Sequence, residues 1–265
     1  MEMEDDLTLL SWTAREAGKI AMRYFQQAQK VWVKSSNSPV SEADFAVDSF
    51  LKRELLSARP DYGWISEESR DDRTKDTKDT YSRFFVVDPI DGTRGFIERK
   101  TGWCISIAVV EDGRPIVGVL ECPAKREQFL TKIGTPALLN GQVIRVALSG
   151  ARSRLLIFCQ KSILNRLPAP FVQSVTPDTS IPSLAYRLAL LSSGRLDVVF
   201  IRSGCHDWDI AAADIILKQS GGTLAGMTGH PIRYHRPSSC HGFLLACGND
   251  MFQSIVDIAS QADFN

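Results

Sequence analysis

The spacing of apolar residues predicts two helices at the start of the chain. Between Leu7 and Phe25, apolar residues recur every three or four positions, so residues 6–28 are predicted to form an amphipathic helix. A second helical pattern opens with Ser41, and Asp44 follows three positions later, which is the spacing of a capping box at a helix start. The chain is therefore expected to begin with two amphipathic helices.

Short apolar runs separated by turn residues predict strands in the middle of the chain. The run FFVV at 84–87 leads into an acidic segment, and the runs at 103–110 and 116–122 flank the turn sequence EDGRP. The stretch at 71–83 is polar and lacks an apolar period, which predicts an exposed loop before the first of these strands. The strands in this part of the chain are expected to pair as hairpins.

The final third of the chain has a different pattern, in which helices and strands alternate. Two helical segments end at Gly194 and Gly221, and the apolar run LDVVFI at 196–201 separates them. Hairpins followed by alternating elements predict the α/β class, with an α+β lobe at 1–147 and an α/β lobe at 148–265.

Composition favours a small molecule as the partner. The chain has 265 residues, of which 44% are hydrophobic and 23% charged, values typical of a globular protein with a sizeable core. Acidic and basic residues number 31 each and form no long runs of one sign, so direct nucleic-acid binding is not expected. The 6 cysteines include no Cys-x-x-Cys pair, which favours free thiols over a disulfide or zinc framework.

The first residues do not have the pattern of a targeting peptide. Their sequence, MEMEDDLTLLSW, is acidic where a signal or transit peptide would be basic. No apolar stretch approaches the roughly 18 residues that a membrane-spanning helix requires. A cytoplasmic protein without a membrane partner is therefore expected.

The segment DPIDGT at 88–93 carries the strongest chemical signal. It places Asp88 before a proline, where an apolar strand is predicted to end, and Asp91 before Gly92, so the turn can bring both carboxylates to one point. Two negative charges so close together are unfavourable unless a cation lies between them. Mg²⁺ is the natural candidate, because it is a hard cation that prefers carboxylate oxygens.

Other acidic residues lie at the edges of predicted elements, and each has a purely structural alternative. Glu67, with Glu68 beside it, follows a short apolar run and could belong to a solvated loop. Asp44 could only cap its helix, and Asp209 could only favour the dipole of the helix that it begins. The extra acid of DPIDGT, at the end of the apolar strand, has no such explanation, because a turn needs one Asp and one Gly.

Other metal motifs fit these residues less well. A haloacid-dehalogenase loop separates its two aspartates by one residue, whereas two residues separate Asp88 from Asp91. An EF-hand loop counted from Asp88 would need Gly at position six and Glu at position twelve, and neither is present. His206 beside Asp207 and Asp209 could hold zinc, but one histidine in an acidic cluster is more often a neighbour than a ligand.

With these motifs, the chain resembles the inositol monophosphatase family of Mg²⁺-dependent, lithium-sensitive phosphatases. The resemblance rests on four segments in the family's order and spacing: SEAD at 41–44, SEES at 66–69, DPIDGT at 88–93 and WDIAAAD at 208–214. It implies a layered α/β/α/β/α sandwich and a small phosphate monoester as substrate. Two or three Mg²⁺ ions, inhibition by Li⁺ and a homodimer are expected for the same reason.

The resemblance also implies which oxygen atoms hold the metal ions. Carboxylates and one backbone carbonyl would be shared between two ions, the first held by Glu67, Asp88 and the carbonyl of Ile90, the second by Asp88, Asp91 and Asp209.

The same resemblance implies how the attacking water is prepared. Thr93, supported by Asp44, would help Glu67 to orient and deprotonate this water. The backbone N–H groups of Gly92 and Thr93, if they open a helix, would hold the phosphate. Direct in-line attack is expected, because no Cys or Ser lies in a recognisable nucleophile motif.

Several positions bear on the choice of phosphate ester. Inositol-specific members usually have DGTTNF where this chain has DGTRGFI, and Arg94 is nearer the basic residue typical of 3'(2'),5'-bisphosphate nucleotidases. In the sugar-contacting region, Ser183 takes the position of a family Thr, after Pro182 in place of Gly. Arg202 falls at about the position of a Glu that contacts inositol hydroxyls, and an arginine can pair with a second phosphate but cannot accept a hydrogen bond.

Two substrates and one other role therefore stay open. The arginines favour 3'-phosphoadenosine 5'-phosphate over inositol monophosphate, although Arg202 could also be an ordinary surface residue and Lys34 a solvated charge. Some bacterial relatives are partners of the transcription machinery, so a regulatory role beside or instead of catalysis is the alternative. Substrate contacts are expected from Gly92, Thr93, Arg94, Ser183, Arg202 and Asp209.

Overall fold

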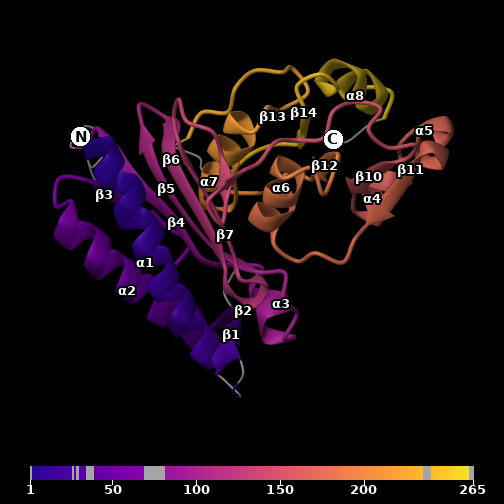
Figure 1. Cartoon of the computed structure of the whole chain (residues 1–265). Coiled ribbons are helices and arrows are strands. Elements are labelled where there is room, and N and C mark those ends of the chain that lie inside the picture. The colour runs from indigo at the N-terminus through magenta and orange to yellow at the C-terminus, as the bar shows by residue number, and fades with distance from the viewer. Residues whose placement is uncertain are drawn as a thin grey trace.

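Helices and sheets alternate in layers (Figure 1). The computed structural model describes residues 2–25, 27, 30–33, 39–68, 81–234 and 240–262. Two helices, a seven-stranded sheet, two further helices, a five-stranded sheet and an outer group of short helices follow one another through the molecule. The layered α/β/α/β/α sandwich is therefore confirmed. Lys34, Ser69 and residues 71–80 of the predicted loop lie outside the described residues.

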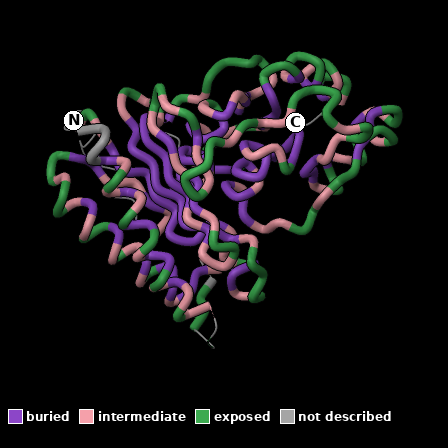
Figure 2. The backbone as a smooth tube through the Cα atoms, in the orientation of Figure 1, coloured by how far each residue is buried: buried purple, intermediate pink, exposed green. Residues whose placement is uncertain are grey.

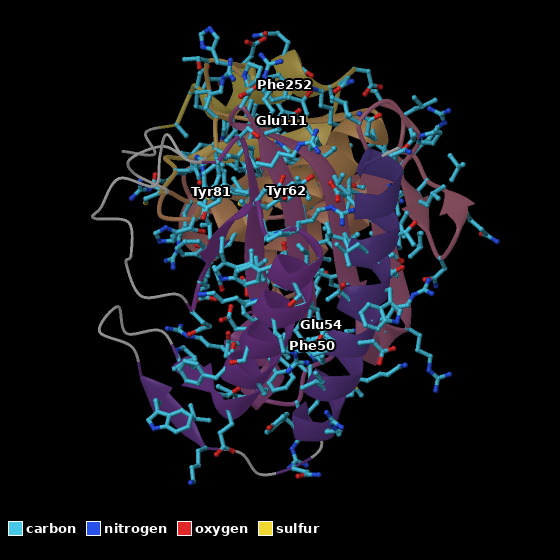
Figure 3. All side chains as sticks on the ribbon, turned by 90° about the vertical axis from the view of Figure 1, so that its left-hand side faces the viewer. Phe50, Glu54, Tyr62, Tyr81, Glu111 and Phe252 are labelled. Atoms are coloured by element: carbon cyan, nitrogen blue, oxygen red, sulfur yellow. The ribbon has the colours of Figure 1, made fainter. Side chains whose placement is uncertain are left out.

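The first layer consists of α1 (Glu2–Phe25) and α2 (Glu42–Ala58), which lie side by side on the seven-stranded sheet (Figures 1 and 3). Their apolar faces share one core with the sheet. The capping box predicted for the second helix is present, with the N–H of Ser41 donating to Asp44 at 2.8 Å. The predicted bounds of the first helix are wrong, because it begins at Glu2 and Gln27 already lies beyond its end.

The strands of the seven-stranded sheet follow chain order. Only the first pair is parallel. Asp112 and Gly113 have φ angles of 50° and 71° and form the tight turn of the predicted hairpin, which is confirmed. The strands are β3 (Gly63–Ser66), β4 (Arg83–Asp91), β5 (Cys104–Glu111), β6 (Arg114–Cys122), β7 (Glu127–Lys132), β8 (Leu138–Leu139) and β9 (Gln142–Val143). A separate hairpin pairs β1 (Val31–Val33) with β2 (Pro39–Ser41).

The central strands are buried along almost their whole length (Figure 2), because helices cover both faces of the sheet. Two expectations about β4 are wrong. Arg83 belongs to the strand and not to the preceding loop, and the strand does not end at Asp88. Its pairing with β5 resumes at Asp91, opposite Cys104.

The five-stranded sheet has two parallel pairs and two antiparallel pairs. Its order is β11 (Val175–Asp178), β10 (Leu155–Phe158), β12 (Val198–Ile201), β14 (Leu244–Gly248) and β13 (Gly222–Ala225). Between the sheets lie α6 (Leu184–Ser192) and α7 (Asp207–Gln219), and the predicted stops after them are Gly194 and Gly221, with φ angles of 70° and 94°. The remaining helices are α3 (Thr93–Ile97), α4 (Lys161–Leu164), α5 (Ala169–Ser174) and α8 (Phe252–Ala259).

The boundary predicted near residue 147 falls between β9 and β10. The division into two lobes stays a prediction, because α7 contacts strands of both sheets. Among the described residues, none of the helices has the length and apolar character needed to cross a membrane.

Candidate metal centre

Asp88 and Asp91 lie at an irregularity of β4. Asp88 is opposite Ser106 and Asp91 is opposite Cys104, so β4 contains one more residue than β5 between these pairs. In a regular strand, side chains three positions apart point to opposite faces, whereas the extra residue of a bulge allows both carboxylates to face the same side. Pro89 suits the bulge, because it has no N–H group that could be left unpaired.

A third acid reaches the bulge from α7. This helix packs across β4, β5 and β6, and the hydroxyl of Ser106 donates to the carbonyl of Trp208 at 3.2 Å, which ties the first helical turn to the sheet. Asp209 occupies the third position of the helix and accepts a hydrogen bond from the N–H of His206 at 2.6 Å. Asp209 therefore lies in the first turn, where it was expected to favour the helix dipole, and it also takes part in a capping box. One hydrogen bond leaves its carboxylate with further acceptor capacity.

The fold gathers three of the predicted ligands. One carboxylate oxygen from each of Asp88, Asp91 and Asp209 lies within 4.8 Å of the other two. Asp88 and Asp91 are buried, and Asp209 is partly exposed. Within the described ranges, no basic side chain forms an ion pair with any of the three. The charge of Arg187 acts on Asp91 and opposes the rise of its pKa, but it forms no ion pair there. Two buried carboxylates and one partly exposed carboxylate without an ion-pair partner fit a hard divalent cation.

Burial raises the pKa of all three carboxyl groups above the ordinary value for aspartic acid. For Asp88, the neighbouring acids Glu67, Asp91 and Asp209 raise the pKa further. For Asp91, two hydrogen bonds to its carboxylate oppose the effect of burial. A cation between these groups would favour their ionised forms.

Hydrogen bonds fix the direction of the two strand carboxylates. The N–H of Ile90 donates to Oδ1 of Asp88 at 3.0 Å. Oδ2 of Asp91 accepts from the hydroxyl of Ser183 at 2.5 Å and from the N–H of Ala185 at 2.6 Å. Because these donors act on one oxygen of each carboxylate, the other oxygen is held in a defined direction.

Glu67 and Asp44 approach the same region from two other elements. Glu67 follows β3, and its N–H donates to the carbonyl of Val87 at 3.2 Å, which holds it beside β4. The hydroxyl of Thr93 lies 3.3 Å from Oδ1 of Asp44 and 3.0 Å from the carbonyl oxygen of Ile90. One hydroxyl proton can serve only one of these acceptors at a time. Asp44 therefore both caps α2 and contacts Thr93.

The predicted phosphate-binding segment has the expected backbone. Gly92 has a φ angle of 92° and precedes α3, which opens with Thr93. An L residue rarely adopts this conformation, and a Cβ atom at Gly92 would lie 3.1 Å from the backbone nitrogen of Ser183. Arg94 is exposed on the same short helix. Helix opening by Gly92 and Thr93 is therefore confirmed, and phosphate binding there stays a prediction.

Ser183, expected to contact the substrate, is completely buried. Its hydroxyl contacts Asp91 and accepts a hydrogen bond from the N–H of Tyr186 at 2.9 Å, which caps α6. The structure therefore gives this side chain a role in holding Asp91, and a direct contact with substrate stays a prediction.

A cavity of about 330 Å³ opens beside Asp91 and Asp209. Arg202 lines this cavity and is exposed, and its contact with substrate stays a prediction. Arg187, which sequence reasoning missed, lines it as well. Burial lowers the pKa of Arg187 to about 10, which leaves its guanidinium charged at neutral pH. The available signal was one charged residue inside the otherwise apolar segment LAYRLALLS.

The zinc alternative loses support from the geometry. The acidic group found among the described residues contains only carboxylates, and the ring of His206 stacks on Trp208 with 4.6 Å between the centroids. Histidine or cysteine ligands are typical of zinc sites.

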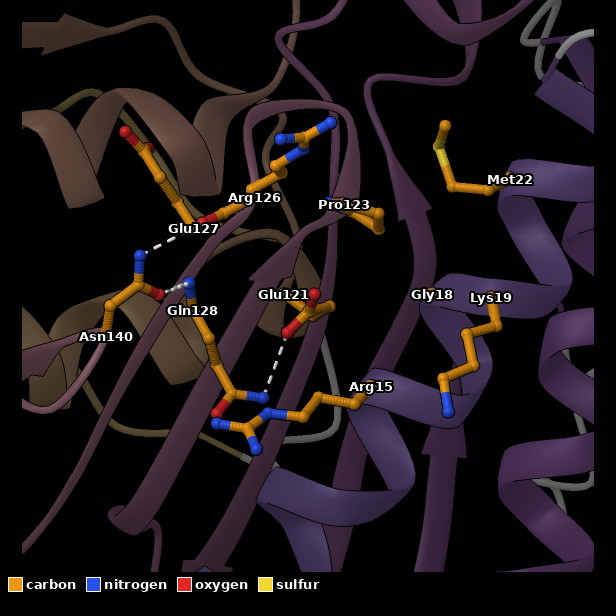
Figure 4. Close-up of a pocket in the computed structure, with 10 residues that line it drawn as sticks. All are labelled: Arg15, Gly18, Lys19, Met22, Glu121, Pro123, Arg126, Glu127, Gln128 and Asn140. Carbon is orange, nitrogen blue, oxygen red and sulfur yellow. Dashed lines mark hydrogen bonds between the residues drawn. The ribbon is translucent and has the colours of Figure 1, made fainter.

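A second cavity, of about 400 Å³, lies between α1 and the ends of β6 and β7 (Figure 4). Glu121 lies on its wall and accepts a hydrogen bond from Gln128 at 2.9 Å. None of the predicted site residues lines this cavity. It is therefore separate from the acidic cluster.

Known proteins resemble this chain along most of its length. It is 30% identical to an inositol-1-monophosphatase from Mesorhizobium japonicum, 29% to the Nus factor SuhB from Xylella fastidiosa and 26% to the 3'(2'),5'-bisphosphate nucleotidase CysQ from Aggregatibacter actinomycetemcomitans. These alignments cover 84%, 82% and 85% of this chain and 86%, 80% and 86% of the relatives. Because the three identities are so similar, they do not favour the role of any one of these relatives for this chain.

A solved structure of an inositol monophosphatase from Zymomonas mobilis superimposes with a TM-score of 0.79 at 25% identity, covering 98% of this chain and 99% of that one. The sequence model of the inositol monophosphatase family matches residues 3–251, a range that includes every acid of the cluster. The acidic cluster, the layered fold and this match lead to one conclusion: the chain belongs to the inositol monophosphatase family.

Proposed function

We propose that the protein is a Mg²⁺-dependent phosphatase that hydrolyses a small phosphate monoester by direct attack of water. The observation that carries the proposal is the convergence of Asp88, Asp91 and Asp209 within 4.8 Å, without an ion pair to a basic side chain among the described residues. When bound, Mg²⁺ would lower the pKa of the attacking water and neutralise charge on the leaving oxygen. Buried acids with a purely structural role are expected to form ion pairs, and these three acids form none among the described residues.

The chain's own residues have distinct parts in this reaction. Glu67, Asp88, Asp91 and Asp209, with the carbonyl of Ile90, would hold the cations. Glu67, helped by Thr93, would orient the water and accept its proton. The 3.3 Å contact between Thr93 and Asp44 supports this assignment, because it directs the hydroxyl from the α2 side. Gly92 and Thr93 would present backbone N–H groups to the phosphate.

The test is phosphate release in the presence and absence of Mg²⁺ by the wild type and by Asp91→Asn. The matched control is Asp257→Asn, which changes an exposed aspartate on α8. Activity that requires Mg²⁺, is lost in Asp91→Asn and is retained in the control would support the proposal. Equal activity of the two variants would overturn it.

Inositol 1-phosphate and 3'-phosphoadenosine 5'-phosphate are the two candidate substrates, and the nucleotide is slightly favoured. The position of Arg202 at the cavity beside Asp209 supports this preference, because a guanidinium can bind a second phosphate. In a side-by-side assay, the nucleotide is expected to lose its advantage in Arg202→Ala. A wild type that prefers inositol 1-phosphate would contradict this expectation and leave the metal site intact.

A regulatory role is the second candidate, favoured by the 29% identity to the Nus factor SuhB. A partner that acts without catalysis would tolerate Asp91→Asn. A cellular phenotype that survives this substitution would support the regulatory role, whereas one that disappears together with phosphate release would support catalysis.

The remaining properties are proposed from the family resemblance. They are two or three Mg²⁺ ions in the site, inhibition by Li⁺, a homodimer and a cytoplasmic location. Sedimentation of the purified chain would test the dimer, and Li⁺ titration of the Mg²⁺-dependent activity would test inhibition.

A further inference from the structure

Arg187 lies in the first turn of α6 and folds back over the segment that leads into this helix. Its Nε donates to the carbonyl of Ile181 and its Nη2 to the carbonyl of Pro182, both at 2.8 Å. The guanidinium carbon lies 3.7 Å from the centroid of the Phe158 ring at the end of β10. Two hydrogen bonds and a stacked ring leave the guanidinium little freedom.

The segment that Arg187 holds is the one that holds Asp91. Ser183 follows the two bridged carbonyls, and its hydroxyl donates to Oδ2 of Asp91 at 2.5 Å. The N–H of Ala185 donates to the same oxygen at 2.6 Å. Because both donors act on Oδ2, their positions determine where Oδ1 points.

The segment is also fixed against the chain that follows β4. The N–H of Ser183 donates to the carbonyl of Gly102 at 3.2 Å, and a Cβ atom at Gly95 would overlap Pro182. The segment therefore lies tightly between α6 and the region around α3. A small displacement at its start would change the direction of the donors to Asp91.

From this chain of contacts we infer that Arg187 is a positioning residue for the metal ligand Asp91. The inference rests on the proposed function for the assignment of Asp91 as a ligand. Arg187 bridges the two carbonyls before Ser183 and so fixes the donors that direct the carboxylate. Direct contact with substrate is the competing explanation, because Arg187 lines the same cavity as Asp91.

The shape of the guanidinium is central to this role. Its planar fork can donate to two carbonyls while it stacks on an aromatic ring. A lysine at position 187 keeps the positive charge but offers a single point of donation. Arg187→Lys therefore separates the effect of geometry from the effect of charge.

The experiment measures Mn²⁺ binding by the full-length chain without substrate, using isothermal titration. Wild type is compared with Arg187→Lys, Arg187→Gln and the control Arg195→Gln. Arg195 is a matched arginine beyond the other end of α6, paired with Glu127 at 2.7 Å and 5.5 Å from the Phe129 ring. Both Arg187 variants are expected to weaken Mn²⁺ binding by roughly tenfold, the effect typical of residues that support metal ligands, with no change in the control.

A double-mutant cycle tests the route through Ser183. If Arg187 acts through this residue, Arg187→Gln and Ser183→Ala together weaken Mn²⁺ binding by less than the product of the separate effects. Independent effects on binding would overturn the inference. So would unchanged Mn²⁺ binding in both Arg187 variants, whether it is accompanied by a higher KM, as expected for substrate contact, or only by a lower Tm.

The same measurements distinguish this inference from the proposed function. A wild-type chain that binds Mn²⁺, loses affinity in the Arg187 variants and hydrolyses no ester would support the inference and overturn the phosphatase assignment. A chain that hydrolyses esters with Mg²⁺ while the Arg187 variants bind Mn²⁺ normally would do the reverse.

Discussion

Buried acids lie near both ends of β4, but among the described residues only the acid near its start forms an ion pair. At that start, Asp6 is completely buried and accepts hydrogen bonds from Arg59 at 2.8 Å and from Tyr62 at 2.9 Å. Arg83 donates in turn to the hydroxyl of Tyr62 at 2.7 Å. Figure 3 labels Tyr62 and Glu111 at this end of the sheet. The carboxylate of Asp6 is thus compensated within the fold.

At the other end, Asp88, Asp91 and Asp209 receive hydrogen bonds mainly from backbone N–H groups and have no ion-pair partner among the described residues. A buried charge without compensation destabilises a fold, whereas a paired one is approximately neutral. The comparison indicates that the first group of charges contributes to structure, and it supports the proposal that the second group binds a cation. Substitutions at the two ends should therefore have opposite consequences.

The largest expected effect is that of Asp88→Asn on catalysis. Activity should fall by at least about a hundredfold, because even residues that only support metal ligands account for effects up to that size. Without metal, the same variant should unfold at a higher temperature than the wild type, since it removes an uncompensated buried charge. Phosphate release and thermal unfolding in chelator measure the two effects, and a variant that is both active and destabilised would contradict the comparison.

The next effect is that of Asp6→Asn on stability. The free energy of unfolding should fall by about 2 kcal/mol, because the partly buried Arg59 loses its charged partner. Activity at saturating Mg²⁺ should change little, since Asp6 lies at the opposite end of β4. Urea unfolding gives the stability. The exposed pair of Arg53 and Glu54 provides the control, because Glu54→Gln should cost less than about 0.5 kcal/mol.

The smallest effect is expected at Glu121. Its carboxylate is partly compensated, because it accepts a hydrogen bond from Gln128 and lies near the charge of Arg15. Burial raises its pKa from 4.5 to about 7. The folded chain therefore binds a proton more tightly than the unfolded chain, and this contribution to stability is lost as pH rises from about 4.5 to 7. Glu121→Gln should be more stable than the wild type at pH 8, and the difference should disappear near pH 4. Unfolding curves at the two pH values test this, and an equal difference at both would contradict it.

Local sequence patterns predicted the features that depend on neighbouring residues. The capping box of Ser41 and Asp44 and the glycine stops after α6 and α7 are fixed by residues within one turn, so their spacing could be recognised. The same holds for the tight turn between β5 and β6. Asp88 and Asp91 were recognised because a motif combined them with a turn, and Asp209 was assigned through the family resemblance.

Features that depend on contacts between distant segments were not predictable. The bulge in β4 depends on its pairing with β5, so the strand was expected to end at Asp88. Arg187 was missed because the ring of Phe158 and the cavity beside Asp91 involve segments far from it in the chain. Ser183 was assigned to substrate from the family resemblance, and its contact with Asp91 was not predictable because the two residues are far apart in the chain.

The bulge has a consequence for protein engineering. The two acids of β4 face one side because of a single additional residue in a strand that is paired on both edges. Copying Asp88 and Asp91 onto a regular strand of another scaffold would place their side chains on opposite faces. A transplantable unit must therefore include the bulged strand, its partner β5 and the start of α7, and the side chains should be added only after that backbone is in place.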